Sequence, residues 1–302
     1  MDYKGEKMVK IKVPASTANI GPGFDTLGLA LNLYNIYEFE EIENGLIIEG
    51  CPEEYQNENN LVYKSFMVVA KDLNKEIKGL KIKMKTNIPV SRGLGSSSAC
   101  IVGGVFGANF LLDGDLSKDE LYKTAVRIEG HPDNITPAVF GGLTASLVED
   151  GMPYYVNYDI DSNVRFCALI PDFETSTAEA RKLLPEKVPY KDAIFNVSRT
   201  AVLLKAFENA DFDLIKIALK DRLHQQYRKT LIHEFDEVEK ICLNNESISV
   251  FVSGSGPTVM NIIQSDEFGN IIKEDLKSLK YNWKVIELNA DKNGTIVEIL
   301  KS

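Results

Sequence analysis

The chain has 302 residues, enough for two domains or for one large domain with a substantial core. Hydrophobic residues make up 44 % of it and charged residues 26 %, an ordinary balance for a globular protein that argues against disorder. The formal charge of −10 argues against a nucleic-acid-binding protein, because such proteins present a basic surface. An anionic substrate would therefore have to be bound by local hydrogen-bond donors.

The sequence offers no segment that could cross a membrane. A long uncharged apolar run, residues 99–112, falls short of the roughly 20 residues that span a bilayer. Near the N-terminus, Lys4, Glu6, Lys7 and Lys10 interrupt any apolar secretory region, so we expect a cytoplasmic protein. The four cysteines stand far apart and predict free thiols, and three histidines are too few for a histidine-rich metal cluster.

The N-terminal part of the chain alternates between strand and helix patterns. Residues 8–13 alternate as a strand, and 26–42 continue as extended chain after the small and turn residues of 14–23. Apolar residues recur at helical spacing over 60–73, and residues 80–84 alternate as another strand. This pattern predicts a sheet rich in hairpins with at least one helix.

The pattern of strands and helices continues to residue 148. Ser117 and Glu120 have the spacing of a capping box, which predicts that a helix begins there and runs to Ile128, with Gly130 ending it. The elements expected in this part are a helix over 99–112, a helix over 117–128, a short helix over 135–140 and a strand over 143–148. The N-terminal half is thus predicted to be a mixed sheet with helices.

The polar, tyrosine-rich stretch 150–163 is the expected crossover between two domains, 8–158 and 159–302. The elements expected after it are a strand over 164–170, a helix over 192–209, strands over 248–252 and 258–263, a helix over 266–279 and a strand over 283–288, with extra helices between about 211 and 243. This βαββαβ order is that of a ferredoxin-like unit.

A glycine- and serine-rich segment, residues 89–100 (PVSRGLGSSSAC), directly precedes an apolar run. Gly93 and Gly95 allow the backbone to approach a ligand closely, and a following helix presents unpaired N–H groups and the positive end of its dipole. The chain lacks the lysine of the common ATPase loop. Backbone N–H groups, the helix dipole, serine hydroxyls and Mg²⁺ would therefore offset a triphosphate's charge. The pattern indicates a nucleotide site, and the alternative is a turn that only caps a helix.

Three further segments carry polar residues that a core does not require. Residues 13–25 (VPASTANIGPGFD) follow a strand and offer the Asn19 amide and the Asp25 carboxylate. Residues 129–134 (EGHPDN) form a turn, and residues 252–258 (VSGSGPT) form a glycine-rich connection between two strands. An Asp after Gly-Pro-Gly is often turn chemistry alone, and the last segment could be a plain hairpin turn.

The blocks PASTANIGPGFD, GLGSSSA and SGSGPT, in this order, resemble the three motifs of the GHMP kinases. GPGFD and GHPDN are similar to the homoserine kinase versions, and the resemblance runs from about residue 9 to residue 259. It implies an α+β fold, with an N-terminal mixed domain followed by a ferredoxin-like C-terminal domain. It also implies transfer of the γ-phosphate of MgATP to the hydroxyl of L-homoserine, giving O-phospho-L-homoserine in threonine biosynthesis.

Two alternatives stand beside this interpretation. One is another small-molecule kinase of the same superfamily, acting on a mevalonate-pathway compound or a sugar. The other is a metabolite-binding regulator without catalytic activity on the same fold. A homodimer is expected from the frequency of symmetric dimers among oligomers.

The resemblance also implies roles for residues in the nucleotide site. Ser97 and Glu129 would be Mg²⁺ ligands, since this hard cation prefers oxygen. The residues implied to contact ATP are Pro89, Val90, Ser91, Arg92, Gly93, Leu94, Gly95, Ser96, Ser97, Ser98 and Ala99.

In the acceptor site, Asp25 is the implied catalytic residue, as the hydrogen-bond acceptor of the reacting hydroxyl. Arg181 and Arg228 would grip the substrate carboxylate, because a guanidinium makes two parallel bonds to it. Gln226 departs from the family's His-Gln-Pro-Tyr-Arg string, where proline is usual. The residues implied to bind L-homoserine are Asn19, Asp25, His131, Arg181, Arg228 and Gly256.

Overall fold

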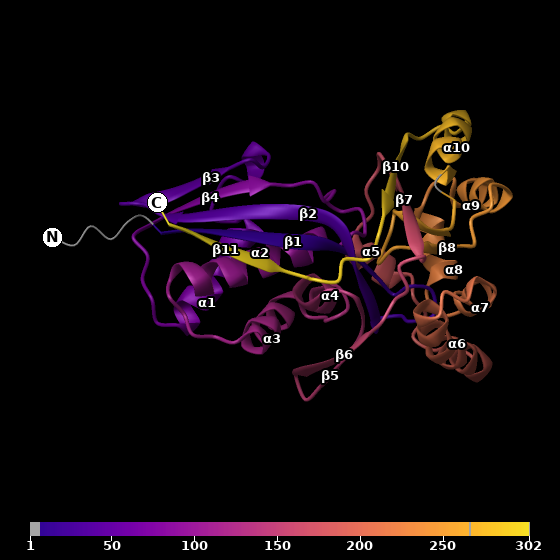
Figure 1. Ribbon diagram of the computed structural model, residues 1–302, viewed down its shortest axis with the longest axis horizontal. Helices are drawn as coiled ribbons and strands as arrows, with labels where there is room; N and C mark the ends of the chain where they lie inside the picture. Colours follow the sequence, from indigo (N-terminus) through magenta and orange to yellow (C-terminus); the bar gives the residue numbers. More distant parts are fainter. Residues whose placement is uncertain (1–6, 266, 302) are drawn as a thin grey trace.

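The structure is a computed structural model that describes residues 7–265 and 267–301 (Figure 1). Lys4, Glu6 and Asp266, which entered the predictions above, lie outside the described residues. Within the described ranges the strands form one sheet of seven strands and one of four. The larger sheet belongs mainly to the N-terminal half, drawn in indigo and purple, and the smaller one to the C-terminal half.

The larger sheet is built on two long antiparallel strands. Alternate side chains of the first strand, Val9, Ile11 and Val13, are fully buried, which confirms the predicted alternation. The order is β11-β1-β2-β4-β3, with β5 paired to β2 and β6 to β5, and only β3 and β4 run parallel. The strands are β1 (Lys7–Ala18), β2 (Leu27–Glu41), β3 (Gly45–Glu49), β4 (Gly79–Lys85), β5 (Leu143–Glu149), β6 (Met152–Tyr158) and β11 (Ile296–Lys301).

Helices cover one face of this sheet (Figure 1). They are α1 (Leu61–Asp72), α2 (Ser96–Leu111), α3 (Lys118–Glu129) and α4 (Ile135–Phe140). Helix α2 lies between the sheet and α1, and close packing requires glycine on it. A Cβ at Gly104 would lie 2.2 Å from the Val62 carbonyl oxygen, and one at Gly107 would lie 2.4 Å from the Phe39 ring. Ser117 and Glu120 form the predicted capping box at the start of α3.

The smaller sheet has the order β10-β7-β9-β8, with every pair antiparallel. This order and the helices between the strands confirm the predicted ferredoxin-like βαββαβ unit. The strands are β7 (Arg165–Pro171), β8 (Ser249–Val252), β9 (Val259–Ile263) and β10 (Trp283–Leu288). The helices are α5 (Thr177–Lys182), α6 (Tyr190–Glu208), α7 (Phe212–Ala218), α8 (Gln225–Arg228), α9 (Phe235–Asn244) and α10 (Phe268–Asp275). Short 3₁₀ turns occupy η1 (Glu53–Tyr55), η2 (Lys229–Leu231) and η3 (Leu276–Ser278).

Several features differ from the sequence predictions: helix α5 was not predicted, and the helix expected over 266–279 is α10 followed by the 3₁₀ turn η3. Helix α2 begins at Ser96 rather than residue 99, because Gly95, in the left-handed region, is its N-cap. The stretch 150–163, predicted to be a crossover, contains the hairpin strand β6, whose largely exposed side chains give no buried alternation. The strands β3 and β11 were not predicted. Since β11 pairs with β1, the end of the chain returns to the larger sheet, and the proposed boundary between 8–158 and 159–302 stays a prediction.

One hydrophobic cluster spans both halves, and a second cluster lies within the C-terminal half. Phe39 of β2 and Phe166 of β7 belong to the same cluster of buried side chains, together with Leu203 of α6. The C-terminal end of β1 and the N-terminal end of β2 extend to the smaller sheet (Figure 1). Among the described residues, no helix is long and apolar enough to cross a membrane.

Candidate active site

The segments 13–25, 89–100 and 252–258 meet where the two halves join. Ser16 N–H donates to the Leu94 carbonyl (3.2 Å), which links the first segment to the second. Ser253 Oγ lies 2.8 Å from Thr17 Oγ1 and donates to the Gly93 carbonyl (2.6 Å), which links all three. Beside this junction lies a cavity of about 760 Å³, lined by residues of all three segments and by the 129–134 turn. This volume is that of a small-molecule site.

The glycine-rich loop presents its backbone to this cavity. Gly93 and Gly95 have φ of +73° and +70°, and a Cβ at Gly95 would lie 2.1 Å from Ser16 Oγ. Ser96, Ser97 and Ser98 form the first turn of α2, and among the described residues no side chain caps that turn. Their backbone N–H groups are therefore available to an anion, at the positive end of a 16-residue helix.

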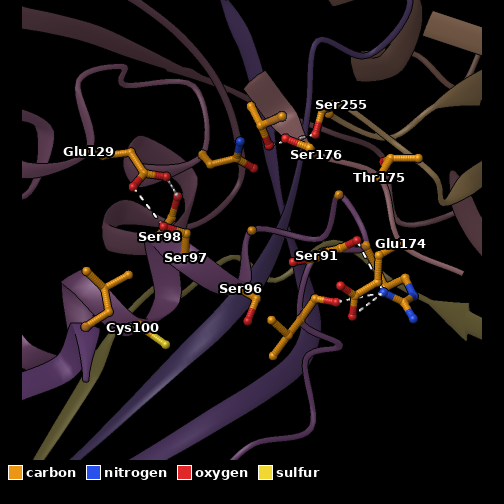
Figure 2. A pocket seen from close by; sticks show the side chains of 18 of the residues that line it. Ser91, Ser96, Ser97, Ser98, Cys100, Glu129, Glu174, Thr175, Ser176 and Ser255 are labelled. Atoms are coloured by element: carbon orange, nitrogen blue, oxygen red, sulfur yellow. Dashed lines mark hydrogen bonds and ion pairs between the residues drawn. The ribbon is translucent and has the colours of Figure 1, made fainter. Parts of the chain in front are cut away.

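Arg92 connects this loop to the smaller sheet. Its Nε donates to the Pro171 carbonyl (3.0 Å), and its Nη2 donates to the Asp172 carbonyl (3.2 Å). Its Nη1 lies 3.0 Å from Glu174 Oε1 (Figure 2). Because these contacts use all three guanidinium nitrogens, the Arg92 side chain fixes the loop to the segment after β7.

Two serine hydroxyls converge on one carboxylate at the start of α2 (Figure 2). Ser97 Oγ donates to Glu129 Oε2 (3.0 Å), and Ser98 Oγ donates to Glu129 Oε1 (2.9 Å). Glu129 is the last residue of α3, which places its side chain over the first turn of α2. The arrangement gathers only oxygen atoms, the donor set preferred by Mg²⁺.

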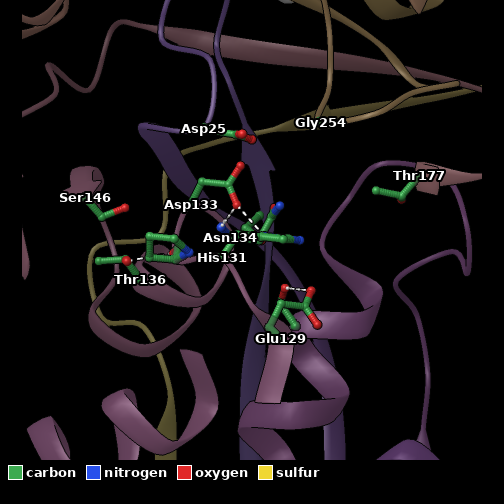
Figure 3. A network of polar contacts seen from close by, with 12 residues as sticks. Asp25, Glu129, His131, Asp133, Asn134, Thr136, Ser146, Thr177 and Gly254 are labelled. Carbon is green, nitrogen blue, oxygen red and sulfur yellow. Dashed lines mark hydrogen bonds and ion pairs between the residues drawn. The ribbon is translucent and has the colours of Figure 1, made fainter. Parts of the chain in front are cut away.

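The turn after α3 carries a histidine–aspartate pair (Figure 3). His131 Nδ1 and Asp133 Oδ1 are 2.9 Å apart, and Asn134 N–H also donates to Asp133 Oδ1 (2.9 Å). The hydrogen bond to Asp133 raises the pKa of His131 and outweighs the opposing effect of burial. Asn134 Oδ1 accepts from Ser16 Oγ (2.9 Å), which ties this turn to β1.

Asp25 forms a bidentate ion pair with Arg181 at the same cavity. Arg181 Nη1 and Nη2 donate to Asp25 Oδ2 and Oδ1 at 2.9 and 3.1 Å. The pair raises the pKa of the guanidinium, and both side chains stay partly exposed, 36 % for Asp25 and 47 % for Arg181. Asp25 N–H donates to Asn19 Oδ1 (3.0 Å), and Asn19 Nδ2 donates to the Gly254 carbonyl (2.8 Å).

Arg228 reaches the same place from α8. Its Nη1 donates to the Gly254 carbonyl (2.9 Å), whereas its Nε is buried with no hydrogen-bond partner among the described residues. Only 3 % of this residue is exposed, and burial lowers the pKa of the guanidinium. A buried charge with an unused donor is costly, so this side chain is suited to bind an anion in the cavity.

A further part of the cavity is mainly apolar. Asn60 Nδ2 donates to the Tyr55 carbonyl (2.8 Å) and lies 3.6 Å from Met84 Sδ and 3.8 Å from Cys51 Sγ. These residues and Leu61 line the cavity near the start of α1. Such a lining fits a flat, mostly apolar group.

The structure brings most of the predicted site residues to this cavity. Those that line it are Asn19, Asp25, Val90, Ser91, Arg92, Gly93, Gly95, Ser96, Ser97, Ser98, Glu129, His131, Arg181 and Arg228. Pro89, Leu94, Ala99 and Gly256 do not line it. Leu94 and Ala99 are fully buried in the core, and Gly254 and Ser255 take the place expected for Gly256.

Several lining residues were not singled out from the sequence. Asp133 and Asn134 lie in the noted segment 129–134, from which only Glu129 and His131 were selected. Residues 174–177 (ETST) line the cavity before α5, and Thr177 Oγ1 lies 3.0 Å from Ser255 Oγ. Three hydroxyl-bearing residues and one acidic residue in succession before Arg181 are the signal that could have found this segment. The apolar residues near Asn60 carry no comparable signal.

Comparisons with known proteins agree with this geometry. The family models for the GHMP kinases N-terminal domain and C-terminal domain match residues 60–142 and 203–282. The fold and the site thus define a GHMP kinase.

A homoserine kinase of Clostridium botulinum is 50 % identical over 296 residues, covering 97 % of this chain and all of that protein. The solved structure of a homoserine kinase from Cytophaga hutchinsonii has a TM-score of 0.86 at 26 % identity, covering 99 % of each chain. A putative homoserine kinase from Listeria monocytogenes has a TM-score of 0.79 at 31 % identity, covering 96 % of this chain and 99 % of that one. The chain belongs to the homoserine kinase family.

Proposed function

We propose that this enzyme transfers the γ-phosphate of ATP to the side-chain hydroxyl of L-homoserine, giving O-phospho-L-homoserine and ADP. The observation that carries the proposal is the position of two polar regions on one cavity. The uncapped first turn of α2 offers N–H groups for a triphosphate, and Asp25, Arg181 and Arg228 offer both signs of charge for a zwitterion. The identity to named homoserine kinases supports this substrate over a sugar or mevalonate.

The nucleotide would bind along the glycine-rich loop. The N–H groups of Ser96, Ser97 and Ser98 would donate to phosphate oxygens, at the positive end of α2. The apolar lining around Asn60 would hold the base. Because Arg92 is engaged by the segment after β7, we assign it to holding the loop rather than to contact with phosphate.

Mg²⁺ fits the oxygen cluster of Ser97 and Glu129. Among the described residues no group of three or more His, Cys, Asp or Glu could hold a metal ion. That finding is compatible with Mg²⁺, which is usually held by one or two protein oxygens together with phosphate oxygens and water. When bound, the ion would offset the charge of the transferring phosphoryl group. Glu129 would orient Ser97 Oγ through the bond that the structure contains.

Homoserine would enter by replacing an internal ion pair. Its carboxylate would take the place of Asp25 as the partner of Arg181, with Arg228 as the second donor. Asp25 would then be free to accept a hydrogen bond from the reacting hydroxyl. Asn19 and the His131–Asp133 pair would contact the rest of the amino acid.

Asp25 would orient the hydroxyl more than deprotonate it. Phosphoryl transfer passes through a loose transition state, so positioning and charge neutralisation supply most of the rate. The N–H groups of the glycine-rich loop would stabilise the phosphate oxygens as charge shifts. The predicted homodimer and cytoplasmic location stay predictions.

A substrate panel tests the proposal. ADP release is coupled to a spectrophotometric readout with L-homoserine, L-serine, L-threonine and mevalonate as acceptors at saturating MgATP. The expected result is a kcat/KM for L-homoserine at least tenfold above that of any other acceptor. Preference for mevalonate would contradict the proposal, and so would binding of ATP and homoserine without ADP release.

A further inference from the structure

Behind the acceptor site lies a buried aspartate–histidine pair that does not line the cavity. Asp221 and His224 both have fully buried side chains and lie in the turn between α7 and α8. Burying a titratable group costs desolvation free energy unless hydrogen-bond partners replace the lost water. The mechanism above gives neither residue a role.

The Asp221 carboxylate accepts four hydrogen bonds. Oδ1 accepts from Asn196 Nδ2 (2.6 Å) and from Leu223 N–H (3.0 Å). Oδ2 accepts from the N–H groups of His224 (2.9 Å) and Gln225 (2.7 Å). Burial raises the pKa of Asp221, but the charge interaction with His224 and the hydrogen bonds from Asn196, Gln225 and His224 together bring it below its usual value. The carboxylate therefore fixes the backbone of the turn that begins α8 and leads to Arg228.

His224 connects this turn to the loop that carries Asp25. Its Nε2 lies 2.8 Å from the Gly21 carbonyl oxygen, and its ring stacks on Phe24 with centroids 5.1 Å apart. Because a carbonyl oxygen can only accept, the ring nitrogen that carries the proton is Nε2. Burial lowers the pKa of His224, against the opposing effect of the Asp221 carboxylate.

Helix α6 holds the next residue of the same loop. Asn196 Nδ2 and Thr200 Oγ1 each donate to the Pro22 carbonyl at 3.1 Å. Asn196 also donates to Asp221, as described above, and its Oδ1 accepts from Arg222 N–H (2.9 Å). One network thus holds the carbonyls of Gly21 and Pro22 and the ring of Phe24.

The Phe24 ring in turn lies beside both arginines of the acceptor site. The guanidinium carbons of Arg228 and Arg181 are 4.9 and 5.9 Å from its centroid. Asp25 follows directly, with a φ of +51°, in the left-handed region that is uncommon for residues other than glycine. The position of Asp25 and of both arginines therefore depends on where Phe24 is held.

We propose that His224, fixed by Asp221, is a positioning residue for the acceptor site. Its hydrogen bond to Gly21 and its stacking on Phe24 fix the position of the loop that contains Asp25. The turn that contains His224 also leads into α8, which carries Arg228. This inference rests on the proposed function only in placing the acceptor at Asp25. Among the described residues, the backbone N–H and the ring of His224 make their hydrogen bonds and ring contact with Asp221, Gly21 and Phe24 and not with the nucleotide loop, so substituting His224 should affect the acceptor and spare ATP.

Three variants at one position separate the hydrogen bond from the ring. His224→Phe keeps a ring for stacking but removes the donor, which leaves the Gly21 carbonyl unpaired. His224→Gln places an amide N–H near the position of Nε2 without the ring, and His224→Asn is too short to reach. The matched control is His233→Phe, because His233 is exposed.

Steady-state kinetics for both substrates supply the readout. We expect His224→Phe to lower kcat/KM for the acceptor about ten- to a hundredfold while the KM for ATP changes less than about threefold. His224→Gln should recover at least about a third of the lost activity, and His233→Phe should match the wild type. Asp221→Asn should reproduce the pattern of His224→Phe, because its amide places donors against backbone N–H groups.

The results that overturn the inference are distinct from failure of the proposed function. Wild-type kinetics in His224→Phe would overturn it, as would equal losses for ATP and acceptor in His224→Phe and His224→Gln. If His224→Phe does not fold, the comparison of His224→Gln with His224→Asn decides, and equal activity of the two contradicts the hydrogen bond's role. If the wild type uses an acceptor other than homoserine, the proposed function fails, and the same ratios with that acceptor judge the inference.

Discussion

Arg181 and Asp25, which lie 156 residues apart in the sequence, bind each other through two parallel hydrogen bonds. Each of them is assigned to a different end of the same substrate. Partly exposed ion pairs contribute only about 0.2–1 kcal/mol, so a substrate that offers a carboxylate and a hydroxyl can replace the contact at little cost. The pair thus holds both side chains at the acceptor site before substrate binds.

Replacing Arg181 by Ala tests the carboxylate assignment. We expect the KM for L-homoserine to rise at least tenfold, because a charge-assisted bidentate contact is lost, while the KM for ATP stays within about twofold. Steady-state kinetics with each substrate varied in turn measures both values. Lys182→Ala is the control, since that neighbouring side chain does not line the cavity. Equal increases in the two KM values would rule out the assignment.

Substitutions of Asp25 separate orientation from proton abstraction. Asn keeps an acceptor oxygen of the same shape, whereas Leu has none. We expect Asp25→Asn to retain at least about a tenth of kcat and Asp25→Leu to lose at least a hundredfold more than Asn, because positioning supplies most of the rate. Pre-steady-state measurement of ADP formation gives the chemical step. A collapse of kcat in Asp25→Asn with unchanged substrate affinity would identify a true base instead.

Glu129→Gln tests the proposed metal cluster. The amide keeps the side-chain volume and can still accept from one serine, but it removes the negative charge beside Ser97. We expect the Mg²⁺ concentration for half-maximal activity to rise at least fivefold and kcat to fall about tenfold or more. A titration of Mg²⁺ at fixed ATP measures the effect. Glu149→Gln, at an exposed position at the end of β5, should leave the titration unchanged.

The pKa of His131 depends on Asp133. Their hydrogen bond raises the pKa of the folded state above the ordinary value of 6.5, so the contact stabilises the fold fully below pH 6.5. That contribution is lost as the pH rises through the folded-state pKa. Asp133→Asn should therefore lower the pKa of His131, measured by NMR titration. It should also reduce the unfolding free energy more at pH 6 than at pH 9. An unchanged titration would contradict the account of this pair.

Gly95→Ala tests the geometry of the loop. The residue has a φ of +70°, and a Cβ would lie 2.1 Å from Ser16 Oγ. We expect a loss of about 1–3 kcal/mol in unfolding free energy, measured in urea, and a raised KM for ATP. Gly151→Ala is the matched control, because Gly151 has a φ of +76° but no atom within 4 Å of a Cβ. It should lose about 1 kcal/mol at most and leave the KM for ATP unchanged.

The sequence predicted those elements of the fold that carry a local pattern of residues. The alternation in β1, the capping box of Ser117 and Glu120 and the βαββαβ order are local signals, and the structure confirms all three. Strand β11 pairs with β1 across nearly the whole chain, a relationship without a local signal. Strand β6 was missed because its side chains are mostly exposed and show no buried face.

The candidate site was predictable where glycine, serine and charged residues cluster in short motifs. The loop around Gly93 and Gly95 and the residues Asn19, Asp25 and His131 all line one cavity. The contact between Asp25 and Arg181 could not be predicted, because it depends on how α5 is placed by tertiary packing. The same holds for the bond from His224 to Gly21, which joins segments 203 residues apart.

The most direct test of the account is a crystal structure of the enzyme with a non-hydrolysable ATP analogue, Mg²⁺ and L-homoserine. The account predicts phosphate oxygens within hydrogen-bond distance of the N–H groups at the start of α2, and the homoserine carboxylate on Arg181 in place of Asp25. A triphosphate bound away from that helix start, or an Arg181–Asp25 pair left intact beside bound homoserine, would contradict it.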